Sequence, residues 1–140
     1  MSPPDLIEMT LELPHPPELV WRALTDPELL ERWLLPVVNH SLEPGARFSF
    51  RAPAQPGWDG TVRCELLAID PPHAIQWSWV VGELDTQVSF TLTPIDQGTR
   101  LTLRHTGFTP DQKQNRGGAR YGWRMMLNRL QELLTTSPSR

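Results

Sequence analysis

The feature that most constrains this chain is a series of five alternating segments in its middle, followed by one long amphipathic segment. Apolar and polar residues alternate in 46–51, 60–69, 74–81, 84–93 and 99–106, as in strands with one buried face. Short turns such as Asp70-Pro71-Pro72 and Asp96-Gln97-Gly98 separate them and favour antiparallel pairing. A sheet with one apolar face must be covered, and the C-terminal segment is the only long element available.

The C-terminal segment has the periodicity of a helix. Its apolar stripe consists of Trp123, Leu127, Leu130 and Leu134, supported by Met126 and Leu133. The pair Gly117-Gly118 predicts a break before this helix. Residues 109–112 (TPDQ) resemble a capping box and predict a short helical turn before that break.

The first third of the chain adds one strand and two short helices. Residues 6–13 (LIEMTLEL) alternate like a half-buried strand. Pro17 and Pro27 each suit a first helical turn, and Asp26 is a natural N-cap for the second helix, which Pro36 ends. The predicted order is therefore β-α-α-β-β-β-β-β-α, an α+β fold with a six-stranded sheet.

Length and composition narrow the class of protein. The 140 residues favour a single domain over 1–140, with 1–5 and 136–140 frayed. The single cysteine, Cys64, excludes an internal disulfide and fits a cytoplasmic protein, and residues 1–5 show no signal peptide. No apolar run reaches the length of a membrane span. The net charge of −3, with both signs interspersed, argues against a nucleic-acid binder.

The sequence does not point to a metal or a cofactor. The four histidines, His15, His40, His73 and His105, are widely scattered and show no HxxxH spacing, and there is no CxxC pair. The segment around Gly117-Gly118, with its flanking arginines, is not a nucleotide-binding loop, because it has neither the motif's lysine nor a suitable preceding strand. A hinge, a cavity lid or a plain flexible loop are the alternatives for that segment.

The ordered pattern resembles a known superfamily. Four stretches carry the resemblance: 20–33 (VWRALTDPELLERW), 43–48 (EPGARF), 60–79 and 105–108 (HTGF) with the helix that follows to Leu134. Together they resemble the START/Bet v 1-like (SRPBCC) superfamily, and within it the activator of Hsp90 ATPase homologue 1-like family, over roughly residues 6–135. The resemblance implies a helix-grip fold, in which a curved antiparallel sheet wraps around a long C-terminal helix with a cavity between them. It does not imply a common reaction.

A set of apolar and aromatic residues is expected to form the walls of that cavity, since large aromatics line ligand pockets as well as cores. They are Trp33, Leu34, Phe48, Phe50, Trp77, Trp79, Phe90, His105, Trp123, Met126, Leu127 and Leu130. A solid core with no room for a ligand is the alternative.

Few residues offer catalytic chemistry. By alternation with Leu101 and Leu103, His105 points inward, where it would orient a ligand, act as a general base or simply bond to the protein. The last is favoured because no carboxylate partner can be assigned. Cys64 sits on an apolar strand face and is interpreted as a core residue. Glu65 and Asp85 are expected to point outward, so they form no catalytic pair.

Three functions follow from these residues and from the resemblance. The favoured one is a binding module for a small hydrophobic or amphipathic molecule, without cofactor, nucleic-acid partner or membrane insertion, as a monomer or weak homodimer. The second is a cyclase- or hydrolase-type enzyme using His105. The third is a module that contacts a chaperone through an exposed face.

Overall fold

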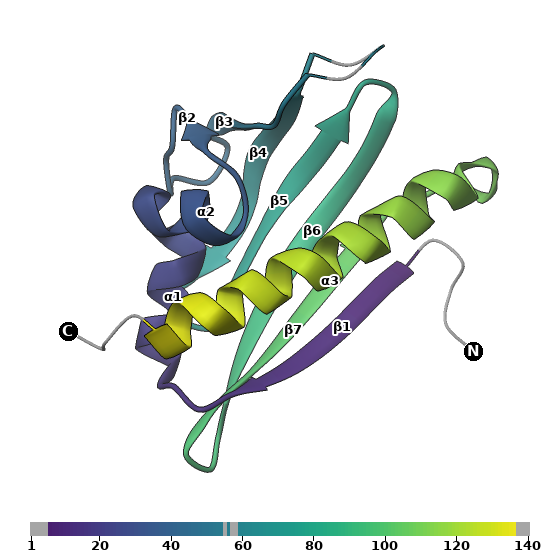
Figure 1. Ribbon diagram of the computed structural model, residues 1–140. Coiled ribbons are helices and arrows are strands. Elements are labelled where there is room, and N and C mark those ends of the chain that lie inside the picture. The colour runs from purple at the N-terminus through teal and green to yellow at the C-terminus, as the bar shows by residue number, and fades with distance from the viewer. Residues whose placement is uncertain (1–5, 55, 57–58, 137–140) are drawn as a thin grey trace.

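Seven strands form one antiparallel sheet in the computed structural model (Figure 1). The structure describes residues 6–54, 56 and 59–136. The strands are β1 (Leu6–Leu13), β2 (Val37–Val38), β3 (Arg47–Arg51), β4 (Thr61–Asp70), β5 (Ala74–Val81), β6 (Leu84–Ile95) and β7 (Gly98–Thr106). Their spatial order is β1-β7-β6-β5-β4-β3-β2, so the N-terminal strand completes the sheet beside the last one.

The sheet has one strand more than the sequence predicted. The six expected strands are present, with ends within two residues of the expected ones. The additional strand, β2, consists of Val37 and Val38, which pair with Phe50 and Ser49 of β3. The prediction of six strands was wrong because two residues are too few to show the alternation by which a strand is recognised.

Helices α1 (Pro17–Thr25) and α2 (Pro27–Trp33) begin at the predicted prolines. The Asp26 carboxylate accepts a 2.9 Å hydrogen bond from the Glu28 N–H, which confirms the predicted N-cap. The indole N–H of Trp33 donates to the Ala23 carbonyl at 2.7 Å and ties the two helices together. They lie at one end of the sheet, beside the C-terminal half of the long helix α3 (Lys113–Thr136) (Figure 1).

The start of α3 differs from the prediction. Gly117 and Gly118 lie inside the helix, so the predicted break before it was wrong. The chain breaks earlier, at Gly107, which has φ +102° and lies so close to Asp85 and Thr86 that a Cβ would crowd their backbone. Glycine disfavours a helix interior by only about 1 kcal/mol, which the packing of the rest of α3 offsets.

The turn before α3 agrees in part with the expected capping box. A 3-10 turn, η1, spans Pro110–Gln112. The Gln112 side-chain oxygen accepts a 2.9 Å hydrogen bond from the Thr109 N–H, as a capping box requires. The Thr109 hydroxyl bonds instead to the Asp111 carboxylate. At the other end α3 continues to Thr136, the first residue of the expected frayed end 136–140, while 1–5 and 137–140 lie outside the described residues.

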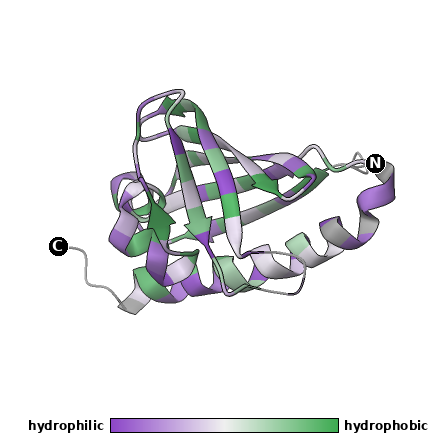
Figure 2. Cartoon of the chain, turned by 90° about the horizontal axis from the view of Figure 1, so that it is seen from above, coloured by the Kyte–Doolittle hydropathy of each residue, from purple (hydrophilic) through white to green (hydrophobic). Residues whose placement is uncertain are grey.

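The core lies between the curved sheet and α3. Figure 2 shows the strands curving over α3, with hydrophobic and hydrophilic residues alternating along them. Phe50, Trp77 and Phe90 form a continuous aromatic layer, with ring centroids 5.9 Å and 5.5 Å apart, and Phe90 reaches Trp123 of α3 at 5.9 Å. Within the described part of the chain, no helix is long and apolar enough to cross a membrane.

Candidate ligand-binding pocket

A pocket of about 500 Å³ lies between the first half of α3 and the sheet. Its walls come from the segments after α2 and β3, from β4, β5 and β7, and from one face of α3. They are Leu35, Ala52, Val62, Trp79, Val81, His105, Gln114, Gly118, Ala119, Gly122, Trp123 and Met126. None of these lining residues is Asp, Glu, Lys or Arg. The pocket is therefore suited to burying apolar surface.

The pocket exists because α3 presents very small residues there. Gly118, Ala119 and Gly122 line it, and residues four apart share a helix face. A Cβ added to Gly118 would meet nothing within 4 Å, and one added to Gly122 would meet only the Met126 methyl carbon, 4.0 Å away. The missing side chains leave the space open between α3 and the strands.

His105 is held at the pocket wall by a buried chain of hydrogen bonds. The Trp123 indole N–H donates to His105 Nδ1 at 2.9 Å, and His105 Nε2 lies 2.7 Å from the Thr86 hydroxyl. The Thr86 hydroxyl itself donates to the Trp79 carbonyl at 2.7 Å. Because the single hydroxyl proton is used there, Nε2 must carry the proton that it shares with Thr86. The chain therefore assigns the Nε2–H neutral tautomer.

Burial reinforces this assignment. His105 has no exposed surface, and desolvation by burial lowers its pKa from 6.5 to about 4. The ring is therefore neutral at pH 7, and both of its nitrogens bond to the protein. A general base needs a lone pair within reach of the substrate, and Nδ1, the acceptor nitrogen, already receives the Trp123 N–H.

The structure brings four of the twelve sequence-predicted wall residues together around this pocket: Trp79, His105, Trp123 and Met126. Seven others are buried elsewhere in the core: Trp33, Leu34, Phe48, Phe50, Trp77, Leu127 and Leu130. Phe90 is also buried, and it borders a separate hollow. The other eight lining residues were not among the predicted walls: Leu35, Ala52, Val62, Val81, Gln114, Gly118, Ala119 and Gly122. The spacing of Gly118 and Gly122 was an available signal, but Gly118 was interpreted only as part of a break, a hinge, a lid or a flexible loop.

Two further expectations concern titratable residues. Cys64 is 5% exposed, and burial raises the pKa of its thiol, which confirms its assignment as a core residue. Asp85 is exposed on β6, as expected. Among the described residues, no group of three His, Cys, Asp or Glu side chains lies close enough to hold a metal ion.

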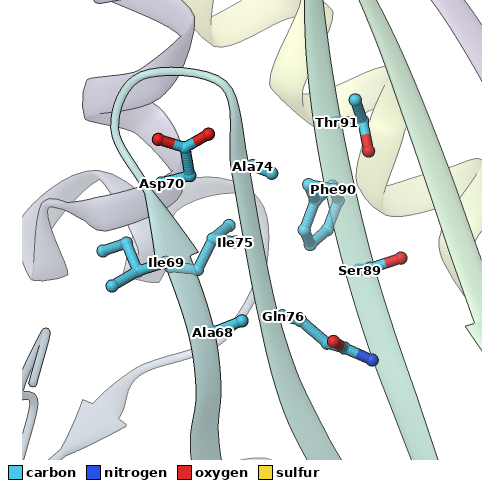
Figure 3. Close-up of a pocket in the computed structure, with 9 residues that line it drawn as sticks. All are labelled: Ala68, Ile69, Asp70, Ala74, Ile75, Gln76, Ser89, Phe90 and Thr91. Carbon is cyan, nitrogen blue, oxygen red and sulfur yellow. The ribbon is translucent and has the colours of Figure 1, made fainter. Parts of the chain in front are cut away.

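A smaller hollow, of about 180 Å³, lies at the turn between β4 and β5, where the pairing shifts between Leu66 and Ala68 (Figure 3). Its polar side chains do not converge. The Asp70 carboxylate lies at the turn, away from the Gln76 amide and the Ser89 hydroxyl. This hollow therefore lacks the grouped polar atoms of a binding site, and the larger pocket is the better candidate.

Comparison with known proteins places the fold and the family. Residues 14–135 match the family described as "Activator of Hsp90 ATPase homolog 1-like protein". The crystal structure of MLL2253 from Mesorhizobium loti is 35% identical over 96% of this chain and 99% of that one, with a TM-score of 0.88. CalU16 from Micromonospora echinospora is 27% identical over 95% of this chain and 76% of that one, with a TM-score of 0.77.

The solution structure of the Aha1 dimer from Colwellia psychrerythraea shares the fold at 17% identity, with a TM-score of 0.81 over 96% of this chain and 98% of that one. No curated protein matches the chain. The family match covers most of the chain, and a solved protein is 35% identical over nearly its full length. The chain therefore belongs to the activator of Hsp90 ATPase homologue 1-like family of the SRPBCC/Bet v 1-like superfamily, as the resemblance predicted.

Proposed function

We propose that this protein binds a small, largely apolar molecule in the pocket between the first half of α3 and strands β4, β5 and β7. The observation that carries the proposal is the pocket itself: about 500 Å³ lined by apolar side chains and small residues. This volume falls in the range of roughly 300–1,000 Å³ that is typical of small-molecule sites.

The aromatic wall supplies the binding energy. The rings of Trp79 and Trp123 lie 5.4 Å apart at the pocket, and both side chains are at least nine-tenths buried. Each Å² of apolar ligand surface removed from water contributes about 25 cal/mol. The hydrogen bonds of His105 to Trp123 and Thr86 hold this wall in place before a ligand arrives, which limits the cost of ordering it on binding.

The geometry gives less support to the enzyme alternative. His105 is the only Asp, Glu, His, Lys, Arg, Cys or Tyr among the described residues that line the pocket. Its two nitrogens are engaged by Trp123 and Thr86. Acid–base catalysis needs a group that can exchange a proton with the substrate, and usually a second group to assist it. A chaperone contact, suggested by the family's description, is a separate proposal that leaves the pocket unused.

Titration with N-phenyl-1-naphthylamine, an uncharged dye that fluoresces in apolar surroundings, tests the proposal. We expect a saturable rise in fluorescence with one dye per chain. Val81 lines the pocket, whereas its neighbour Val80 borders the opposite face of the sheet. Val81→Phe should therefore abolish the rise, and Val80→Phe should retain it. Equal binding by both variants, or no saturable binding by the wild type, would contradict the proposal.

A further inference from the structure

We propose that the pocket selects an uncharged ligand, and that Gly118 and Gly122 of α3 set the largest ligand it admits. This inference rests on the proposed function and specifies it in two ways: the charge of the ligand and its size. Different residues determine the two properties.

The preference for an uncharged ligand follows from the absence of charged side chains among the described residues of the pocket wall. Among the described residues that line the pocket, none is Asp, Glu, Lys or Arg, so none of them would offer an opposite charge to an anion or a cation. His105 offers no positive charge, because its neutral form is fixed by its bonds to Thr86 and Trp123. A charge buried without a partner costs more than the apolar contacts would return. Gln114 supplies amide polarity only, which suits a neutral polar group.

A cation held by the tryptophans is the strongest alternative. Trp79 and Trp123 would need to present open ring faces to the cation. Their rings instead pack against each other, tilted by 49°, and Trp79 also packs on Phe50 at 5.7 Å. Part of the surface of each ring is therefore covered by a neighbouring protein side chain and is not available to a cation. An uncharged ligand needs no open ring face and is favoured.

The size of the ligand follows from the glycines. Glycine is among the least favourable residues for a helix interior, so Gly118 and Gly122 do not serve the stability of α3. Both line the pocket, and the position of an added Cβ is open at each. A larger side chain at either position would project from the α3 wall and take up space now available to a ligand.

Gly117 provides a matched control for this argument. It lies next to Gly118 in the same helix, an added Cβ there would also meet nothing within 4 Å, and it does not line the pocket. Gly117→Leu, Gly118→Leu and Gly122→Leu all exchange glycine for the same good helix former. A difference in binding among them therefore reports on the pocket rather than on the stability of the helix.

The experiment for size measures the affinity of the three variants for N-phenyl-1-naphthylamine. Gly122→Leu and Gly118→Leu should weaken binding by about tenfold or more, and Gly117→Leu should change it by less than about twofold. Far-ultraviolet circular dichroism checks that each variant is folded. Equal affinities for all three variants and the wild type would overturn the role of the glycines.

The experiment for charge uses pairs of probes that share a skeleton. The neutral dye should bind at least about tenfold more tightly than 8-anilinonaphthalene-1-sulfonate, which adds a sulfonate to the same rings. Likewise, 1-methylnaphthalene should displace the neutral dye, and its cationic counterpart 1-methylquinolinium should not. Equal binding within either pair would overturn the inference on charge. A wild type that binds neither dye would instead refute the proposed function.

Discussion

At the scale of single residues, His105 shows how a chemically versatile side chain can be given a fixed role. Alternation along β7 correctly predicted that it points inward, where its exposed fraction is zero. Its role depends on Thr86 and Trp123, which approach from β6 and α3 and occupy both ring nitrogens. A side chain with both nitrogens bonded to protein serves to orient its neighbours rather than to exchange protons with a substrate.

The pKa of His105 predicts how the free energy of unfolding depends on pH. Folding lowers this pKa from 6.5 to about 4, so between these values the unfolded chain binds the proton and the folded one does not. The stabilisation is present above pH 6.5 and is lost as the pH falls towards 4, by about 3 kcal/mol in total.

Urea unfolding between pH 4 and pH 8 measures this loss. The variant His105→Gln, which has no titrating group at that position, should lose about 3 kcal/mol less than the wild type over the same range. Subtracting the two curves removes the contribution of the carboxylates. Parallel curves would show that His105 does not titrate differently in the folded and unfolded chains.

The partners of His105 could not be predicted from the sequence. Thr86 and Trp123 are 19 and 18 residues away, and their contact depends on the exact placement of β6 and α3. The sequence also could not predict that a polar group in the core would have no partner, as is the case for Trp77. Its buried indole N–H has no hydrogen-bond partner among the described residues, which no pattern of residues indicates. Periodicity specifies the face on which a side chain lies, but it does not specify which polar atoms meet there.

At the scale of elements, α3 consists of two physically different halves. The second part, 123–136, carries four buried side chains, Trp123, Leu127, Leu130 and Leu134. The first part, 113–122, contains three glycines, including Gly118 and Gly122, which line the pocket, and none of its described side chains is buried. The first half is therefore held mainly by its own backbone hydrogen bonds, while the second half is anchored in the core.

Hydrogen exchange should reveal the two halves of α3. We expect amides of the first half, 113–122, to exchange much faster than those of 127–134, because local opening there exposes little apolar surface. Gly117→Ala should slow exchange in the first half by about fivefold, since it favours the helix by roughly 1 kcal/mol without touching the pocket. Uniform protection along α3, unchanged by this substitution, would show that the helix opens as a unit.

The start of α3 was predicted incorrectly for a physical reason. Gly117-Gly118 carries a strong local signal for a break, but the helix continues through it because residues from Trp123 onward anchor it to the core. Local propensity is a weak signal that tertiary packing can override. The same error hid part of the pocket, since Gly118, which was taken for part of a break, lines its wall.

At the scale of the whole molecule, the sequence predicted the arrangement of layers and the family better than it predicted the pocket. The layers and the order of elements along the chain depend on the periodicity of many residues, which can be recognised in the sequence. The pocket depends on a few small residues and on how far α3 stands from β5, and neither is visible as a pattern. For that reason Trp79 and Trp123 were placed at the pocket, while Gly122 and Leu35 were not.

The pairing of β1 with β7 joins the first strand of the chain to the last. Neighbouring residues on β1 make apolar and charged contributions to its stability that can be measured separately. Ile7 of β1 is completely buried, and its neighbour Glu8 pairs with Arg104 on the exposed face at 2.6 Å. Truncating a buried isoleucine costs about 2–5 kcal/mol, because it removes apolar contacts and leaves a cavity. An exposed ion pair contributes less than about 1 kcal/mol, because water screens it.

Two adjacent substitutions on β1 therefore have very different expected effects. Ile7→Ala should lower the free energy of unfolding by about 2–5 kcal/mol, whereas Glu8→Gln should lower it by less than about 1 kcal/mol. Urea titrations at low and high salt measure both, and added salt should remove the Glu8 effect while leaving the Ile7 effect unchanged. Comparable losses for the two variants would mean that charge, and not burial, holds the first strand to the last.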